Sequence, residues 1–155
     1  MRDTLILSYA RVWPVGLSPV APGTCCSLVA IVLAPFVFMP LPLWGRVLVL
    51  LFVLITGTIA STRAEQILGK KDPSEVVIDE VFGQWITILP FALLAWWEYA
   101  VAFVLFRAFD ILKPWPIKRL EDIDGGLGVM IDDAAAGIYA LLCMLLLRYL
   151  PVIGG

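Results

Sequence analysis

The stretch that decides the fold is residues 45–62, GRVLVLLFVLITGTIAST, in which Arg46 is the only charged residue. A run of this kind is typical of a helix that crosses the ~30 Å hydrocarbon core of a bilayer, because each crossing takes roughly 20 helical residues. The pattern predicts an all-α fold, a polytopic membrane helix bundle of about five transmembrane helices. The other four apolar runs lie at residues 24–41, 74–95, 97–112 and 128–150.

The composition of the whole chain supports this interpretation. Hydrophobic residues make up 61% of the 155 residues and charged residues only 15%, with a mean hydropathy of +0.96. Such values lie outside the range of ordinary soluble domains. The length suits one compact bundle, so we expect a single domain over residues 1–155. The net charge of -2 excludes the basic footprint of a nucleic-acid-binding protein.

The basic residues predict the orientation in the membrane. Cytoplasmic segments carry an excess of Lys and Arg. If the N-terminus is cytoplasmic, only Arg46 and Arg148 fall on the outer side of a five-span protein. We therefore expect a cytoplasmic N-terminus. The nine basic residues on that side are Arg2, Arg11, Arg63, Lys70, Lys71, Arg107, Lys113, Lys118 and Arg119.

The same topology places five carboxylates from three apolar runs near the cytoplasmic face. A carboxylate within a membrane helix costs about 3 kcal/mol or more, so it is usually a functional group with a partner. Ligation by oxygen alone suits a hard cation, with Mg²⁺ first. The alternative is that the acids pair with Arg107 and Lys113 in buried salt bridges. The five predicted metal ligands are Asp79, Glu80, Asp110, Asp132 and Asp133.

Other residue types narrow the chemistry. The chain contains no histidine, which excludes a phosphohistidine, a Ser-His or Cys-His pair and a His-ligated metal. Its three cysteines lie in apolar segments without C-x-x-C spacing, so we interpret them as small core residues. Residues 1–15 are interrupted by charge and lack a cleavage site, so we expect no cleavable signal peptide.

Glycine and helix-start patterns accompany the acids. Gly83 follows Asp79 by four residues, and Gly137 follows Asp133 by four. Since residues four apart share a helix face, each pattern predicts close helix approach or space for an ion. Asp72, followed by a proline and by a glutamate three residues on, predicts a helix N-cap there.

Several residues are candidates for binding a phosphate group. Arg107, Asp110 and Lys113 recur every three residues and resemble a phosphate clamp on one helix face, and the prolines after Lys113 are expected to end that helix. Gly125 and Gly126 precede an apolar helix and could present backbone N–H groups to a phosphate or form a flexible connector. Thr24 and Ser27 offer hydroxyl groups on the same side, with Thr24 alternatively an ordinary N-cap.

These motifs together resemble the phosphatidylglycerophosphatase A family. The resemblance implies Mg²⁺-dependent hydrolysis of phosphatidylglycerophosphate, a membrane phospholipid, to phosphatidylglycerol and inorganic phosphate, at a site facing the cytoplasm in the bacterial inner membrane. One departure is Cys26, where the family commonly has glycine. The motifs that carry the resemblance are APGTCCSL (21–28), KKDPSEVVIDEVFGQWIT (70–87), FRAFDILKPWPI (106–117) and GGLGVMIDDAAAG (125–137).

The predicted mechanism assigns catalytic roles to Asp79, Asp110 and Asp133 and substrate binding to Thr24, Ser27, Arg107, Lys113, Gly125 and Gly126. The five carboxylates hold Mg²⁺ against the terminal phosphate of the lipid. Either a carboxylate acts as general base for water or an Asp attacks phosphorus, and the sequence leaves both routes open. The main alternative is a small ion or proton carrier that uses intramembrane carboxylates. A structural membrane scaffold is a third interpretation.

Overall fold

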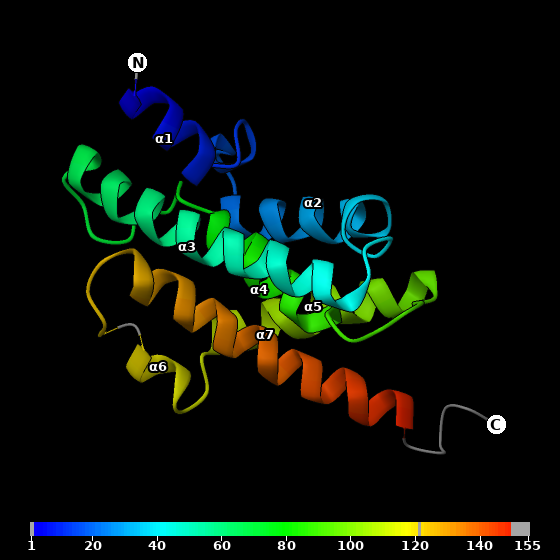
Figure 1. Cartoon of the computed structure of the whole chain (residues 1–155). Helices are drawn as coiled ribbons and strands as arrows, with labels where there is room; N and C mark the ends of the chain where they lie inside the picture. Colours follow the sequence, from blue (N-terminus) through cyan, green and yellow to red (C-terminus); the bar gives the residue numbers. More distant parts are fainter. Residues whose placement is uncertain (1, 121, 150–155) are drawn as a thin grey trace.

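The computed structural model describes residues 2–120 and 122–149. Within these ranges every regular element is helical, which confirms the all-α prediction. Figure 1 shows the arrangement. The elements are α1 (Arg2–Ala10), the 3₁₀ helix η1 (Val15–Leu17), α2 (Pro22–Val37), α3 (Leu43–Leu68), α4 (Ile78–Ile88), α5 (Trp96–Leu112), α6 (Ile117–Leu120) and α7 (Gly126–Tyr149).

Five of these helices overlap the five predicted apolar runs, one helix to each run. They are α2, α3, α4, α5 and α7, and consecutive members of this set run in opposite directions (Figure 1). Among the described residues, α3 and α7 are long and apolar enough to cross a membrane by length and composition. The five-span count and the cytoplasmic N-terminus stay predictions.

Helix α4 is much shorter than the predicted run at 74–95. The predicted N-cap at Asp72 is wrong: Asp72 has a left-handed φ of 44°, and its N–H donates to Glu65 Oε1. Val77 N–H then donates to Ala10 O at the end of α1, which delays the helix start to Ile78. The eleven residues of α4 extend roughly 16 Å, about half the hydrocarbon thickness.

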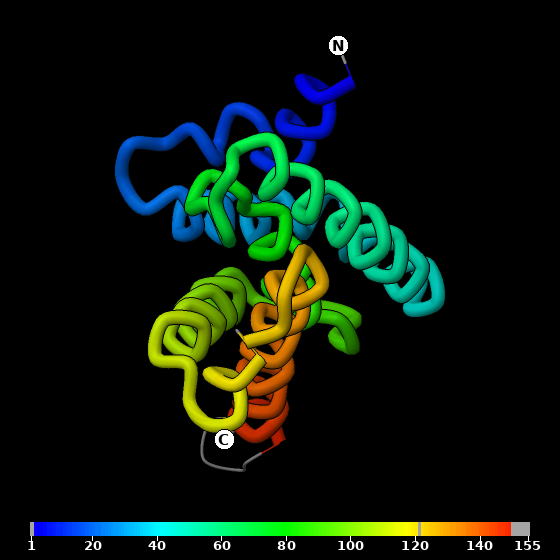
Figure 2. The backbone as a smooth tube through the Cα atoms, turned by 90° about the vertical axis from the view of Figure 1, so that its left-hand side faces the viewer, coloured from blue at the N-terminus to red at the C-terminus, as the bar shows by residue number. Residues whose placement is uncertain are grey.

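Helix α4 lies at the centre of the molecule. It packs against α2 and α3 on one side and against α5 and α7 on the other. Figure 2 shows these two groups, with the N-terminal helices above and the C-terminal helices below. Nine of the eleven residues of α4 are buried, so this short helix fixes the relative positions of its neighbours.

Two glycines allow α4 and α7 to approach closely. A Cβ at Gly83 would lie 2.6 Å from the carbonyl oxygen of Asp133, and one at Gly137 would overlap the carbonyl oxygen of Gly83. The backbones therefore touch at this crossing, as predicted from the spacing of Asp79 with Gly83 and of Asp133 with Gly137.

Arg46 links two turns at the end of the bundle away from the starts of α4 and α7. It is buried, and its guanidinium donates to the carbonyl oxygens of Leu41 (2.9 Å), Met39 (2.6 Å), Leu89 (3.1 Å) and Phe91. These carbonyls belong to the turn between α2 and α3 and to the turn after α4. Arg46 is thus a buried structural residue whose hydrogen bonds link the two turns.

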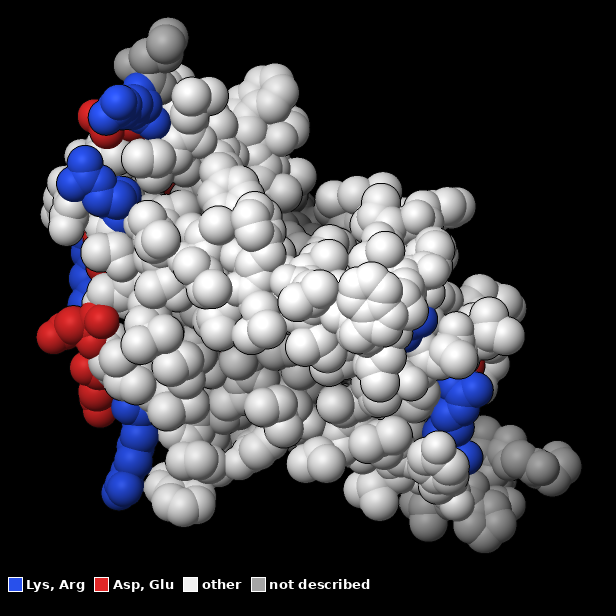
Figure 3. All heavy atoms as spheres, viewed as in Figure 1, with Lys and Arg blue, Asp and Glu red and all other residues white. Residues whose placement is uncertain are grey.

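The outer surface has the character of a membrane protein. Figure 3 shows charged side chains gathered at the two edges of one face, with a broad uncharged band between them. Exposed tryptophans lie toward both ends: Trp44 and Trp96 are in the first turns of α3 and α5, whereas Trp13 and Trp115 lie in the loops that follow α1 and α5. Tryptophan is enriched at both membrane–water interfaces. This surface supports association with a membrane.

Candidate active site

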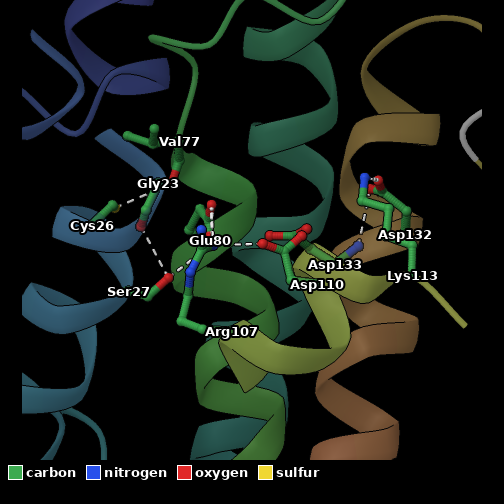
Figure 4. A network of polar contacts seen from close by, with 10 residues as sticks. All are labelled: Gly23, Cys26, Ser27, Val77, Glu80, Arg107, Asp110, Lys113, Asp132 and Asp133. Atoms are coloured by element: carbon green, nitrogen blue, oxygen red, sulfur yellow. Dashed lines mark hydrogen bonds and ion pairs between the residues drawn. The ribbon is translucent and has the colours of Figure 1, made fainter. Parts of the chain in front are cut away.

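A polar network joins α2, α4 and α5 in the interior (Figure 4). Ser27 Oγ on α2 lies within hydrogen-bond distance of Glu80 Oε2 on α4, at 2.7 Å. Arg107 Nη1 on α5 contacts both carboxylate oxygens of Glu80 at 2.7 Å and also pairs with Asp110. Glu80 thus receives contacts from both neighbouring helices, and Arg107 is shared between two carboxylates.

Gly23 makes room for this network. A Cβ on Gly23 would overlap Glu80 Oε1. Glycine at position 23 therefore lets the carboxylate of Glu80 lie against the first turn of α2, where Ser27 can reach it. Gly23 was not among the predicted site residues, although it lies within the motif APGTCCSL, which would have pointed to it.

A second charged pair joins α5 and α7. Lys113 Nζ contacts Asp132 Oδ2 at 2.8 Å, and the backbone N–H of Asp133 donates to Asp132 Oδ1 at 3.0 Å. Lys113 follows the last residue of α5 and has a left-handed φ of 41°. The prolines that follow it end α5 as predicted, and Lys113 pairs with α7 instead of continuing the helix face of Arg107.

Among the acids that the structure describes, Asp79 and Asp133 are the two with a buried oxygen that lacks a partner. Asp79 Oδ1 and Asp133 Oδ2 are buried without a hydrogen-bond partner. Asp79 lies one turn before Gly83, on the face of α4 that touches α7, and Asp133 is the α7 residue whose carbonyl Gly83 approaches. The charges of Asp79 and Glu80 both act on Asp133, so the acids of α4 and α7 share one electrostatic environment.

The predicted acids thus lie on helices that pack together, but they differ in the cation with which they pair. Glu80 and Asp110 pair with Arg107, and Asp132 pairs with Lys113, as the salt-bridge alternative expected. Among residues 2–120 and 122–149, no three His, Cys, Asp or Glu side chains are grouped closely enough to hold a metal ion by themselves. The roles predicted for these residues, including the five-ligand metal site, stay predictions.

Arg107 also retains a binding capacity. Its Nε is buried without an acceptor. This donor belongs to α5, which packs against both α4 and α7, the helices that carry the two unpaired acid oxygens. A buried polar atom without a partner costs about 1–3 kcal/mol, so these three atoms are positions where water, an ion or a ligand could supply the partner. A donor and two acceptors together suit an anion bound next to a cation.

Other predicted phosphate ligands have different surroundings. Helix α2 begins at Pro22 with Ala21 as N-cap, so the N-cap alternative for Thr24 is wrong. Gly126 N–H donates to Thr62 Oγ1 on α3 at 2.9 Å, and a Cβ on Gly126 would overlap the carbonyl oxygen of Thr58. Gly126 therefore serves the packing of α7 on α3, and no pattern in the sequence predicts its contact with Thr62. Substrate binding by Thr24, Gly125 and Gly126 stays a prediction.

A recess leads from the outside to Asp132. It has a volume of about 310 Å³ and lies between the loop after α3 and the start of α7, where Gly125 and Gly128 line it. Lys71 on its wall donates to Asp124 Oδ1 at 2.9 Å, and this hydrogen bond lowers the pKa of Asp124. The acidic cluster can therefore be reached from the end of the bundle where most basic residues lie.

The match to a known family agrees with this arrangement. The family model of phosphatidylglycerophosphatase A matches residues 9–148, which include every residue of the network. The chain belongs to the phosphatidylglycerophosphatase A family. The acidic cluster, the shared arginine and the recess beside Asp132 are the candidate functional site of this chain.

Three relatives have been named by activity. Phosphatidylglycerophosphatase A of Escherichia coli is 38% identical over 128 residues, covering 79% of this chain and 72% of that protein. The protein of the same name from Haemophilus influenzae is 35% identical over 138 residues, covering 86% and 83%. A Bacteroides thetaiotaomicron protein, named "Putative phosphatidylinositol-3-phosphatase", is 37% identical over 140 residues, covering 86% and 87%. No solved structure matches the chain significantly.

Proposed function

We propose that this protein is a membrane phosphatase that hydrolyses the terminal phosphomonoester of phosphatidylglycerophosphate to phosphatidylglycerol and inorganic phosphate. Family membership supports a phosphatidylglycerophosphatase. The observation that carries the assignment to a site is the buried cluster in which Asp79, Asp133 and Arg107 each keep an unpaired polar atom. The proposed location is the bacterial inner membrane, as a multi-pass protein whose site faces the cytoplasm.

The donor set fits Mg²⁺. This ion is commonly held by one or two carboxylates, with water and substrate phosphate completing its shell. Asp79 and Asp133 supply two such carboxylates from facing helices, so we assign them as the ligands from the protein. When bound, the ion would neutralise phosphate charge and lower the pKa of a bound water. Glu80, Asp110 and Asp132 then act chiefly by holding the two cationic side chains.

The remaining residues bind and orient the phosphate. Arg107 is held by Glu80 and Asp110, so its Nε is fixed in direction and can donate to a phosphate oxygen. Lys113 is held by Asp132 at the mouth of the same cluster and adds a point charge. Pre-oriented donors of this kind stabilise the charge that develops on the phosphoryl oxygens during transfer. A carboxylate base and an attacking Asp remain the two proposed routes.

The ion-carrier alternative receives no support from the buried acids. A carrier needs acids through the depth of the bilayer. Glu98, the acid predicted on the opposite side, accepts a hydrogen bond from the N–H of Ala95 at 2.6 Å and pairs with Arg148. It therefore caps α5 and links it to the end of α7, whereas the unpaired acids lie near the starts of α4 and α7.

The proposal is tested by phosphate release from phosphatidylglycerophosphate by the purified protein in detergent. We expect release with Mg²⁺, none with a chelator, and recovery when Mg²⁺ is restored. Asp79→Asn and Asp133→Asn should each lower kcat/KM by about 100-fold or more, because each removes a charged ligand. Asp3→Asn, at an exposed position on α1, is the matched control.

Substrate choice needs a parallel measurement. Phosphatidylinositol 3-phosphate is the second substrate, because one relative carries that activity in its name. A higher kcat/KM on phosphatidylglycerophosphate supports the proposal. Preference for the inositol lipid, or full turnover by folded Asp79→Asn protein, contradicts it.

A further inference from the structure

An apolar groove lies between α2 and α5 on the outside of the molecule. It has a volume of about 340 Å³, and its lining is almost entirely apolar. Leu28 and Val32 line it from α2, and Ala100 and Phe103 line it from α5. Leu28 and Val32 are exposed, so the groove opens onto the surface that would face lipid. None of the residues that line the groove belongs to the polar network of Glu80 and its partners.

One end of the groove adjoins the polar network. Leu28 directly follows Ser27, and Phe103 lies one helical turn before Arg107. Ser27 and Arg107 both point at Glu80 (Figure 4). The apolar lining therefore changes to the charged cluster within one turn of each helix. A ligand that occupied both would need an apolar part joined directly to an anionic part.

The direction of the groove also fits such a ligand. Its lining extends from Leu28 to Pro35 along α2 and from Phe103 back to Trp96 along the antiparallel α5. Seven residues of helix span roughly 10 Å, which compares with about 15 Å for the apolar part of one leaflet. The groove thus follows the path of an acyl chain that hangs from a headgroup at the network.

We propose that the groove holds one acyl chain of the phospholipid whose phosphomonoester is bound at Arg107. This inference rests on the proposed function and adds a second binding subsite to it. The chain orients the lipid so that its phosphate enters the cluster from the α2–α5 side. A peptide or a second protein copy fits less well, because the groove ends at a buried charge network and not at a further apolar face.

The test uses a matched pair of valines on α2. Val32 lines the groove, whereas Val29 is also exposed but does not line it. Val32→Trp fills the groove, and Val29→Trp adds the same side chain at a nearby exposed position that does not line the groove. Ala100→Trp fills the groove from α5. Each variant is assayed on dipalmitoyl phosphatidylglycerophosphate and on the dibutanoyl analogue, whose chains are too short to occupy the groove.

The expected result separates binding from chemistry. Val32→Trp and Ala100→Trp should raise KM for the long-chain lipid by about three- to tenfold with kcat nearly unchanged, because a remote subsite contributes uniform binding. Kinetics on the dibutanoyl substrate should stay as in the wild type. The inference is overturned if Val29→Trp behaves like Val32→Trp, if both substrates are affected equally, or if no variant changes KM.

A second measurement works without turnover. A phosphatidylglycerophosphate with a photoreactive group in the middle of one chain should crosslink to the α2 and α5 residues of the groove. Phosphatidylcholine with the same chain should label the lipid-facing helices evenly. Selective labelling without any phosphate release would support acyl-chain binding in the groove and contradict the proposed phosphatase activity. Phosphate release with even labelling would support the phosphatase activity and contradict acyl-chain binding in the groove.

Discussion

At the scale of single residues, Gly23 and Glu80 form a contact that can be broken without breaking the fold. A Cβ on Gly23 would overlap the end of the Glu80 side chain, which can turn away. We expect Gly23→Ala to leave the helices in place but to cost about 1–3 kcal/mol of stability, because buried Glu80 loses its contacts with Ser27 and Arg107. Because small misplacements of binding groups are costly in catalysis, kcat/KM should fall about 10- to 100-fold.

The control for that substitution is Gly45→Ala on α3. A Cβ at position 45 would meet its neighbours at 3.4 Å or more, which is ordinary contact. Activity and thermal unfolding in detergent are measured for both variants. Equal activity of the two variants would show that the position of Glu80 does not matter for turnover.

The same residues show what sequence can and cannot predict about the site. The i, i+3 spacing of Arg107 and Asp110 was enough to predict that they meet, since both lie on one helix. The contact of Arg107 with Glu80, 27 positions earlier, depends on how α4 and α5 pack, which no spacing encodes. The acids were therefore predictable as a set, but their division into paired and unpaired members was not.

At the scale of elements, the crossing of α4 and α7 is set by backbone contact. A Cβ on Gly137 would overlap the carbonyl oxygen of Gly83, and backbone cannot turn aside as a side chain can. Gly137→Ala should therefore lower the free energy of unfolding by about 1–3 kcal/mol through overpacking. Thermal unfolding measures this loss, with Gly45→Ala again as control. Unchanged stability would mean that the two helices separate easily.

Arg46 makes a second prediction at the same scale. Arg46→Met keeps much of the buried length but leaves four carbonyl oxygens without their donor. We expect a loss of about 2–4 kcal/mol in stability, with kcat retained below the unfolding temperature because the acidic cluster lies at the other end. Arg63→Met, at an exposed residue whose guanidinium donates to Gln66 Oε1, should be near neutral.

Helix α4 is the element that is much shorter than the sequence predicted. Residues 76 and 77 are as apolar as those inside the helix, so hydropathy extends the run beyond Ile78. What stops the helix is tertiary: the N–H of Val77 is bonded to Ala10 of α1, and the left-handed backbone at Asp72 turns the chain. The spacing at Gly83 and Gly137 predicted close helix approach or space for an ion, but it did not predict that α4 and α7 are the two helices that meet there.

At the scale of the whole molecule, the charge distribution predicts one orientation in the membrane. The loop at 69–77 carries Lys70 and Lys71 and lies at the end of the bundle where α7 begins, whereas Pro40 lies in the turn between α2 and α3 at the other end. Positive charge is retained on the cytoplasmic side. In intact cells, a membrane-impermeant thiol reagent should therefore label Pro40→Cys and not Lys70→Cys.

Permeabilised cells provide the control, because both cysteines are exposed positions and should react there. The native cysteines are replaced in both variants, and phosphate release confirms that each remains folded. Labelling of Lys70→Cys alone in intact cells would place the acidic cluster on the outer side. In that case the lipid substrate would have to be presented from the outer leaflet, since the recess beside Asp132 opens at the end of the bundle that carries Lys71.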